Sequence, residues 1–205
     1  MLKEEERRER EQAIYRAVLR LAGSGADISR LRVQEIAAEA GMGKGTVYEY
    51  FASKDEILHR MTSYCMDSEL SRVEELLDRC TTLDRVEQAM TEYLLDMHRT
   101  RGEVYWVISR ALAAKGRKYP CTWSRLLRGR LEKCLRRLVE RLQKAGEIDP
   151  ALDAGYCVFV LISVFMMHAV ELGVHDEQGP AAEAVSANAR RMLSRALRPM
   201  PGNDL

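Results

Sequence analysis

The sequence predicts an all-α protein, in which an N-terminal three-helix domain built on a helix-turn-helix is followed by a larger helical domain, about nine helices in all. Hydrophobic residues make up 46% and charged residues 31% of the 205 residues, which is typical of a folded globular chain. Only 5 prolines are present, and apolar residues recur at helical spacing without the alternation of a strand. Glycines and helix-capping residues separate the apolar stretches.

The first three helices are predicted by an apolar stripe and by glycine breaks. Residues 5–22 carry an apolar stripe at i, i+3, i+4 and i+7, formed by Ile14, Ala17, Val18 and Leu21. A short helix fits 33–40, and Gly41 follows where a helix can end in a left-handed residue. A third helix fits 44–50, and Val47 and Phe51 can pack back on the first two.

A longer series of helices follows. Ser53 and Glu56 form a capping box that starts a helix over 54–80. Asp149 and Pro150 provide a cap residue and a first-turn proline for a helix that reaches residue 172. The other predicted helices cover 83–98, 103–114, 122–144 and 180–197.

Several classes of protein do not fit the composition. The N-terminal residues 1–11 have mixed charge and no apolar core, unlike a secretory signal. The apolar run 155–170 is shorter than a membrane span of about 20 residues, so we expect a buried helix and no membrane partner. Five cysteines without a CxxC pair favour reduced thiols in the cytoplasm, and we expect no metal site and no cofactor.

Three glycines within residues 41–45 could belong to a phosphate-binding loop or to a DNA-reading turn. A P-loop requires Ser or Thr after Gly-Lys and a strand in front, but Lys44 is followed by Gly45 in a helical context. The dinucleotide fingerprint fails as well, because its third glycine would fall on Thr46 or Tyr48. Two short helices joined by a tight glycine turn instead fit a helix-turn-helix, whose second helix can enter the major groove.

The second helix of this motif would present its polar side to DNA. The exposed residues would be Lys44, Gly45, Thr46, Tyr48 and Tyr50, with Lys54 at a phosphate beside the first turn of the next helix. Packing of the tyrosine rings and plain solvation of the two lysines are the alternatives. The first 54 residues hold 10 Lys/Arg and 9 Asp/Glu, so we expect modest nonspecific affinity, with binding that depends on dimerisation and salt.

The segment VQEIAAEAGMGKGTVYEYFASKDEIL, residues 33–58, resembles the DNA-binding signature of the tetracycline-repressor (TetR) family of bacterial regulators. The resemblance implies a DNA-binding domain over 1–54 and a ligand-binding and dimerisation domain over 55–205. It assigns Lys44, Gly45, Thr46, Tyr48, Tyr50 and Lys54 to DNA, and adds Gln34 as a further contact. Two departures from the signature are Arg32, where members commonly have a capping Thr or Ser, and Gly43, where Ser often caps the third helix.

A single recognition helix contacts too few bases to specify one genomic site, so a two-fold dimer on two half-sites is expected. The resemblance implies a homodimer formed through the last two helices; burial within a monomer is the alternative. It also implies a pocket for a small apolar or aromatic effector, although ordinary core packing would use the same residue types. The candidate ligand-binding residues are Tyr93, Met97, Tyr105, Trp106, Trp123, Phe159, Met166, Met167 and His168.

These features indicate a ligand-responsive DNA-binding regulator that binds a palindromic operator in double-stranded DNA and is released by its effector; repression is what the family resemblance implies. The alternative is a thiol sensor on the same DNA-binding domain, using Cys121 or Cys157. An enzyme is not expected, because no nucleophile–base pair or paired carboxylates are evident. The basic segment 110–144 fits a solvated helix face or, alternatively, a membrane-surface or anion-binding role.

Overall fold

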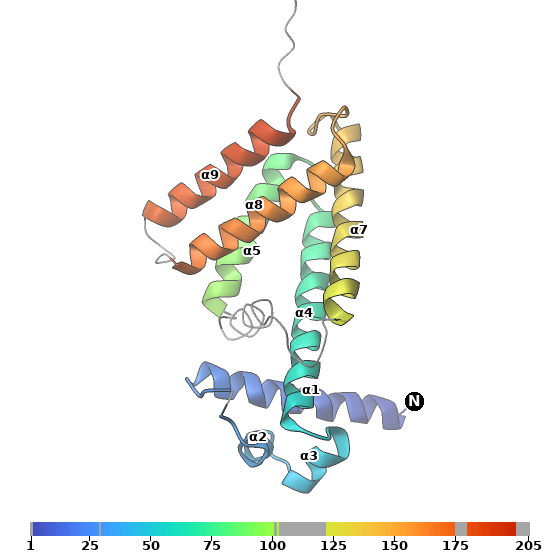
Figure 1. Cartoon of the computed structure of the whole chain (residues 1–205), viewed down its shortest axis with the longest axis vertical. Helices are drawn as coiled ribbons and strands as arrows, with labels where there is room; N and C mark the ends of the chain where they lie inside the picture. The colour runs from blue at the N-terminus through green and yellow to red at the C-terminus, as the bar shows by residue number, and fades with distance from the viewer. Residues whose placement is uncertain (1, 29, 101, 103–121, 175–179, 200–205) are drawn as a thin grey trace, which may run out of the picture. The chain divides into compact units, whose positions relative to one another are not determined.

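The computed structural model describes residues 2–28, 30–100, 102, 122–174 and 180–199, and every regular element in these ranges is an α-helix. The chain divides into two compact units, the first containing residues 1–68 and the second residues 69–100 and 121–205. Helix α4, Lys54–Asp78, contributes residues to both units (Figure 1). The domain boundary between residues 54 and 55 stays a prediction.

The first unit is built from α1 (Leu2–Gly23), α2 (Val33–Glu39), α3 (Lys44–Tyr50) and the first part of α4. These bounds confirm the helices expected from the sequence. Apolar side chains from all four helices and from the connection after α1 form one core, comprising Ile14, Tyr15, Val18, Ile28, Leu31, Ile36, Ala37, Val47, Phe51, Ile57, Met61 and Cys65.

Gly41 turns the chain between α2 and α3. Its φ is +67°, a conformation that glycine adopts without the steric penalty of a side chain. The amide of Gly41 donates to the carbonyl of Ala38 at 3.1 Å, and the amide of Met42 donates to that of Ala37 at 2.9 Å. This pair of hydrogen bonds is a Schellman motif, which pairs the last carbonyls of α2 and directs the chain into α3.

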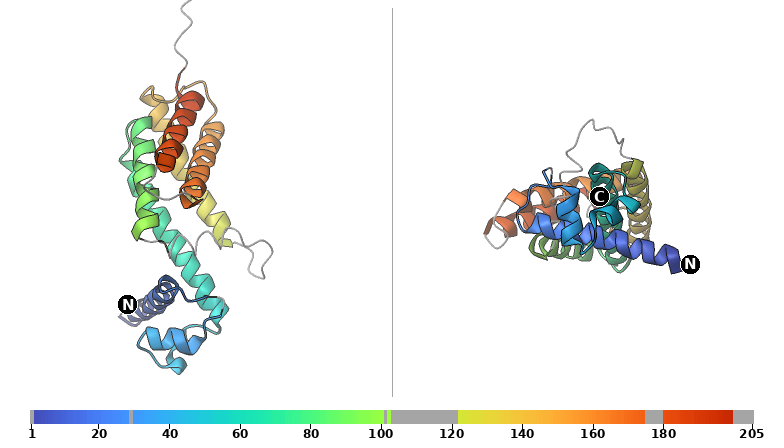
Figure 2. Two further views of the ribbon diagram at one scale, coloured as in Figure 1. Left: turned by 90° about the vertical axis from the view of Figure 1, so that its left-hand side faces the viewer. Right: turned by 90° about the horizontal axis from the view of Figure 1, so that it is seen from below.

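The second unit contains the end of α4 together with α5 (Leu83–Thr100), α7 (Thr122–Lys144), α8 (Ala154–Val174) and α9 (Pro180–Leu197). Helices α8 and α9 run antiparallel and side by side (Figures 1 and 2). The core of this unit contains residues from the end of α4 and from α5, α7, α8 and α9. Its largest fully buried side chains are Leu77, Leu83, Leu138, Leu142, Ile148 and Leu161. The predicted helix over 103–114 lies outside the described residues.

Helix α8 begins at Ala154, so the prediction that Asp149 and Pro150 open it was wrong. The carboxylate of Asp149 accepts from the amide of Ala151 at 2.8 Å, and the amide of Leu152 donates to the Asp149 carbonyl at 3.2 Å. These bonds close a separate turn. Asp153 caps α8 instead, because its Oδ1 accepts from the amide of Tyr156 at 3.0 Å.

Residues Ala154–Glu171 of α8 have the length and apolar composition of a membrane span. One side of the helix nevertheless packs in the core of the second unit, through residues such as Cys157, Leu161 and Val164. Only 28% of this stretch is buried within the single chain. Helix α8 is therefore a core helix with a second, exposed apolar face.

Candidate functional site

Helix α3 has one side in the core and the other side exposed. Val47 is fully buried, and Phe51, the residue after the helix, is nearly so. Lys44, Gly45 and Tyr48 are exposed on the opposite side, and the Lys44 Nζ lies 5.9 Å from the centroid of the Tyr48 ring. The buried pair fixes which side of α3 faces outward, and that side carries an ammonium group, a phenol and a glycine without a side chain.

The other predicted recognition residues are only partly exposed. Thr46 is half-buried, and Tyr50 packs its ring partly against the core of the first unit. The alternative of ring packing is therefore realised at Tyr50, while Tyr48 is exposed. A phenol can pack its ring and still direct its hydroxyl toward a ligand. Contact of these residues with DNA stays a prediction.

The start of α2 lacks the usual side-chain cap. The backbone amide of Arg32 donates to Glu35 Oε2 at 2.7 Å, which forms one half of a capping box. The same hydrogen bond lowers the pKa of the Glu35 carboxyl. Arginine has no acceptor atom to complete the other half, so its side chain stays exposed beside Gln34, which is also exposed.

Helix α4 begins with the predicted capping box. The amide of Glu56 donates to Ser53 Oγ at 3.2 Å, and the Glu56 carboxylate accepts from the amide of Ala52 at 2.7 Å. Lys54 lies in the first turn and is half-buried. An anion near this turn would meet both the lysine charge and the positive end of the helix dipole.

Three of the predicted effector residues are well packed in the second unit. Met97 is buried, and the hydroxyl of the half-buried Tyr93 donates to Glu69 Oε2 at 2.8 Å. His168 is buried, with its Nε2 3.2 Å from Ser186 Oγ and no hydrogen-bond partner at Nδ1. Burial lowers the pKa of His168, and the nearby Glu87 carboxylate opposes that shift.

The sequence did not reveal that Glu69 is buried and paired with Tyr93. It is a buried carboxylate on a helix of mixed charge, where a glutamate usually points to solvent. No local pattern distinguishes it from its exposed neighbours, and its partner Tyr93 lies 24 positions away.

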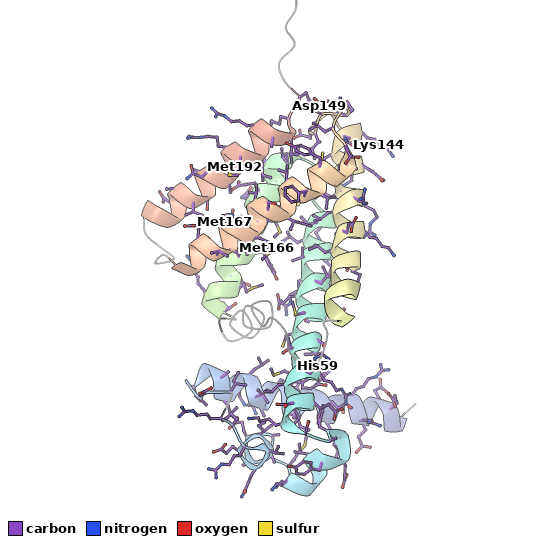
Figure 3. The ribbon with its side chains drawn as sticks, in the orientation of Figure 1. His59, Lys144, Asp149, Met166, Met167 and Met192 are labelled. Carbon is purple, nitrogen blue, oxygen red and sulfur yellow. The ribbon has the colours of Figure 1, made fainter. Side chains whose placement is uncertain are left out.

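Three other predicted effector residues do not suit an enclosed pocket within one chain. Phe159, Met166 and Met167 on α8 are 69%, 51% and 57% exposed, and Figure 3 shows the two methionines on α8 with Met192 on the neighbouring α9. Walls of a pocket are mostly buried, whereas these three residues lie on an exposed apolar face of the single chain. Their contact with an effector stays a prediction. Helical periodicity does not reveal this, because α8 is apolar all round.

The remaining predicted pocket residues cannot be placed. Tyr105 and Trp106 lie outside the described residues, and Trp123 lies on α7 with its side chain outside them. A depression of about 380 Å³ lies on α9, but all five lining residues come from this one helix and none was predicted to bind an effector. We therefore assign no ligand to it.

The described cysteines give little support to a thiol sensor. Cys65, Cys80, Cys134 and Cys157 are buried. Burial raises the pKa of Cys80, Cys134 and Cys157, which disfavours the reactive thiolate. Cys121 lies outside the described residues. Within the described part of the chain, no three metal-binding side chains form a cluster.

The N-terminal part of the chain matches a known family model. Residues 25–61 match the model of bacterial regulatory proteins of the tetR family. No curated protein sequence matches the chain.

Solved structures of similar fold span almost the whole chain. A TetR family transcription regulator from Marinobacter aquaeolei is 17% identical, with a TM-score of 0.67 over 96% of this chain and 98% of that one. The SmeT–triclosan complex is 15% identical, with a TM-score of 0.69 over 95% and 96%. FadR from Bacillus subtilis, in complex with stearoyl-CoA, is 16% identical, with a TM-score of 0.58 over 90% and 98%. At these identities the likeness shows a shared fold.

Proposed function

The chain belongs to the tetR family of bacterial regulatory proteins, and from this premise we propose that it binds a palindromic operator as a homodimer and leaves it when a small apolar effector binds. It is a DNA-binding transcriptional regulator and not an enzyme. The observation that carries the proposal is α3, which exposes Lys44 and Tyr48 above a buried Val47. The family resemblance favours repression over activation.

Dimerisation is supported by the exposed apolar face of α8. Its residues recur at helical spacing on the side opposite the core, and Ser163 is the single polar member among Tyr156, Phe159, Ser163, Met166, Met167 and Val170. An apolar face of this kind marks an interaction surface. A second copy of the chain presents the same face, so two α8 helices can cover each other around a two-fold axis.

The side chains of Tyr93 and Met97 support an apolar effector. Methionine adapts to irregular apolar ligands, and the Tyr93–Glu69 pair supplies a polar anchor in the same unit. Two structures of similar fold contain triclosan, an apolar aromatic molecule, and stearoyl-CoA, which carries a long apolar acyl chain on a charged nucleotide. In this proposal the effector changes the separation of the two recognition helices, which must match half-sites about 34–36 Å apart.

The DNA contacts are tested by selecting duplexes from a random library with the wild-type protein and titrating the selected duplex. Lys54→Ala should weaken binding to all sequences and lower the dependence of log affinity on log salt by about one, as expected for one phosphate contact. Lys44→Ala and Thr46→Ala should instead change which sequences are selected. Lys133→Ala, an exposed lysine on α7, is the matched control and should change neither.

Tyr48→Ala provides the decisive outcome. Its ring is exposed, so the substitution leaves the core intact and removes only an outward phenol. Unchanged affinity of both Tyr48→Ala and Lys54→Ala would show that DNA binds elsewhere on the protein.

A further inference from the structure

Arg60, near the start of α4, joins three helices of the first unit. Its Nη2 donates to Glu11 Oε2 on α1 at 2.6 Å. Its Nη1 donates to the carbonyl of Tyr50, the last residue of α3, at 3.4 Å. Its guanidinium also lies over the ring of Phe51, 4.9 Å from the centroid. One side chain therefore contacts α1 and the end of α3 from α4.

Glu11 is held in place from two sides. Its side chain is buried, and its Oε1 accepts from Arg7 Nε at 3.3 Å while its Oε2 accepts from Arg60. Figure 3 labels His59, the neighbour of Arg60, where α4 passes α1. Without Arg60 the buried Glu11 carboxylate would keep only the longer contact with the exposed Arg7, which compensates less of its desolvation. Glu11 therefore depends mainly on Arg60.

Apart from the turn at Gly41 and the packing of Val47 and Phe51, few contacts fix the direction of helix α3. It has only 7 residues, and its N-cap, Gly43, makes no side-chain hydrogen bond. Its C-cap, Phe51, already has extended backbone with φ −139° and ψ 127°. The last carbonyls of a helix need partners, and Arg60 provides one for Tyr50 while its planar group covers the Phe51 ring.

We propose that the Glu11–Arg60 pair is a positioning element that sets the angle of α3 against α1 and α4, and thereby controls discrimination between operator and other DNA. The inference rests on the proposed DNA-binding function of α3. Base-edge contacts require side chains within hydrogen-bonding distance of fixed atoms, whereas phosphate contacts by flexible lysines tolerate displacement. Loss of the pair should therefore weaken specific binding more than nonspecific binding.

The test compares Arg60→Met, Arg60→Lys and Glu11→Gln with Arg10→Met. Arg10 lies on the exposed side of α1 and pairs with Glu6 at 3.1 Å, so it is a matched control. Two duplexes serve as probes: one selected by the wild type from a random library, and a shuffled duplex of the same base composition. Hydrogen exchange of the amides of residues 47–51 is measured in the absence of DNA.

Arg60→Met should lower affinity for the selected duplex at least about tenfold, with affinity for the shuffled duplex within twofold and faster exchange at residues 47–51. Arg60→Lys keeps the ion pair with Glu11 but loses the planar contacts of the guanidinium. Its affinity for the selected duplex should therefore lie between those of Arg60→Met and the wild type, and so should that of Glu11→Gln. Arg10→Met should match the wild type.

Equal losses on both duplexes would overturn the proposal, because they would indicate a direct phosphate contact by Arg60. Unchanged affinity and exchange in Arg60→Met would overturn it as well. Should Arg60→Met fail to fold, the same two comparisons apply to Arg60→Lys. If the wild type itself selects no duplex, the proposed function fails, and the exchange rates still decide whether Arg60 holds the end of α3.

Discussion

Phe159 offers the sharpest test of the dimer. Its side chain is 69% exposed on a helix whose other side is in the core. With about 200 Å² for an aromatic side chain, roughly 140 Å² is available for burial against a partner. At about 25 cal/mol per Å² this area corresponds to about 3.5 kcal/mol per protomer, or about 7 kcal/mol for the two copies in a two-fold dimer.

The measured loss should be smaller than this figure, because ordering of side chains and imperfect desolvation consume part of the gain at an interface. If about half of this free energy is lost in Phe159→Ala, the dimer dissociation constant rises about three hundredfold. Sedimentation velocity over a concentration series measures that constant, and far-UV circular dichroism checks that the helices remain. Tyr48→Ala is the control, since it removes an exposed aromatic ring from α3.

The two variants should behave in opposite ways. Phe159→Ala should weaken DNA binding at low protein concentration and recover at high concentration, because the operator requires the dimer. Tyr48→Ala should weaken DNA binding at every concentration and leave the dimer unchanged. A dissociation constant of Phe159→Ala within threefold of wild type would refute the assignment of this α8 face to the partner.

Two further predictions concern stability. Gly41→Ala should lower the free energy of unfolding by about 1–2 kcal/mol, because alanine is strained at φ +67°. Gly45→Ala, inside α3 with free space around it, should raise the free energy of unfolding by about 0.5–1 kcal/mol while weakening DNA binding. Urea titration measures both free energies, and changes of the same sign would contradict the argument. Burial lowers the pKa of His168 from its usual 6.5, so the unfolded chain takes up a proton first as pH falls. Stability should therefore drop below about pH 6.5 in wild type and drop less in His168→Gln, as checked by thermal melts at pH 7.5 and 5.5; parallel pH profiles would show that another group is responsible.

The helix ends were predictable where one residue type has one local role. Gly41 and the Ser53–Glu56 box determine backbone geometry within a few positions, and the structure confirms both. Asp149 misled the prediction because Asp can cap a helix or close a turn. Its carbonyl and amide are bonded to Gln143 and Leu197, and no short-range pattern encodes these contacts.

The exposed side of α3 could be predicted because its motif is local, whereas burial of side chains in the second unit depends on which side of a helix meets which neighbour. Phe159 and Leu161 are equally apolar, yet one is exposed and the other fully buried. Glu69 and Glu11 are buried by partners on other helices, Tyr93 and Arg60. The composition of one helix does not show which of its side chains a neighbouring helix will bury.

Helix α4 contributes to the contacts that hold α3 in the first unit and to those around Tyr93 in the second unit. Toward its start, Arg60 holds the end of α3. Further along the same helix Glu69 accepts from Tyr93, and Glu74 binds Arg130 of α7 at 2.5 Å. Coupling between two sites requires an element whose position both sites influence, and α4 contributes residues to both units. An effector that competes with Tyr93 for Glu69 would act on α4 directly, so a substitution such as Glu69→Gln should alter the effector response of DNA binding while leaving DNA affinity without effector unchanged.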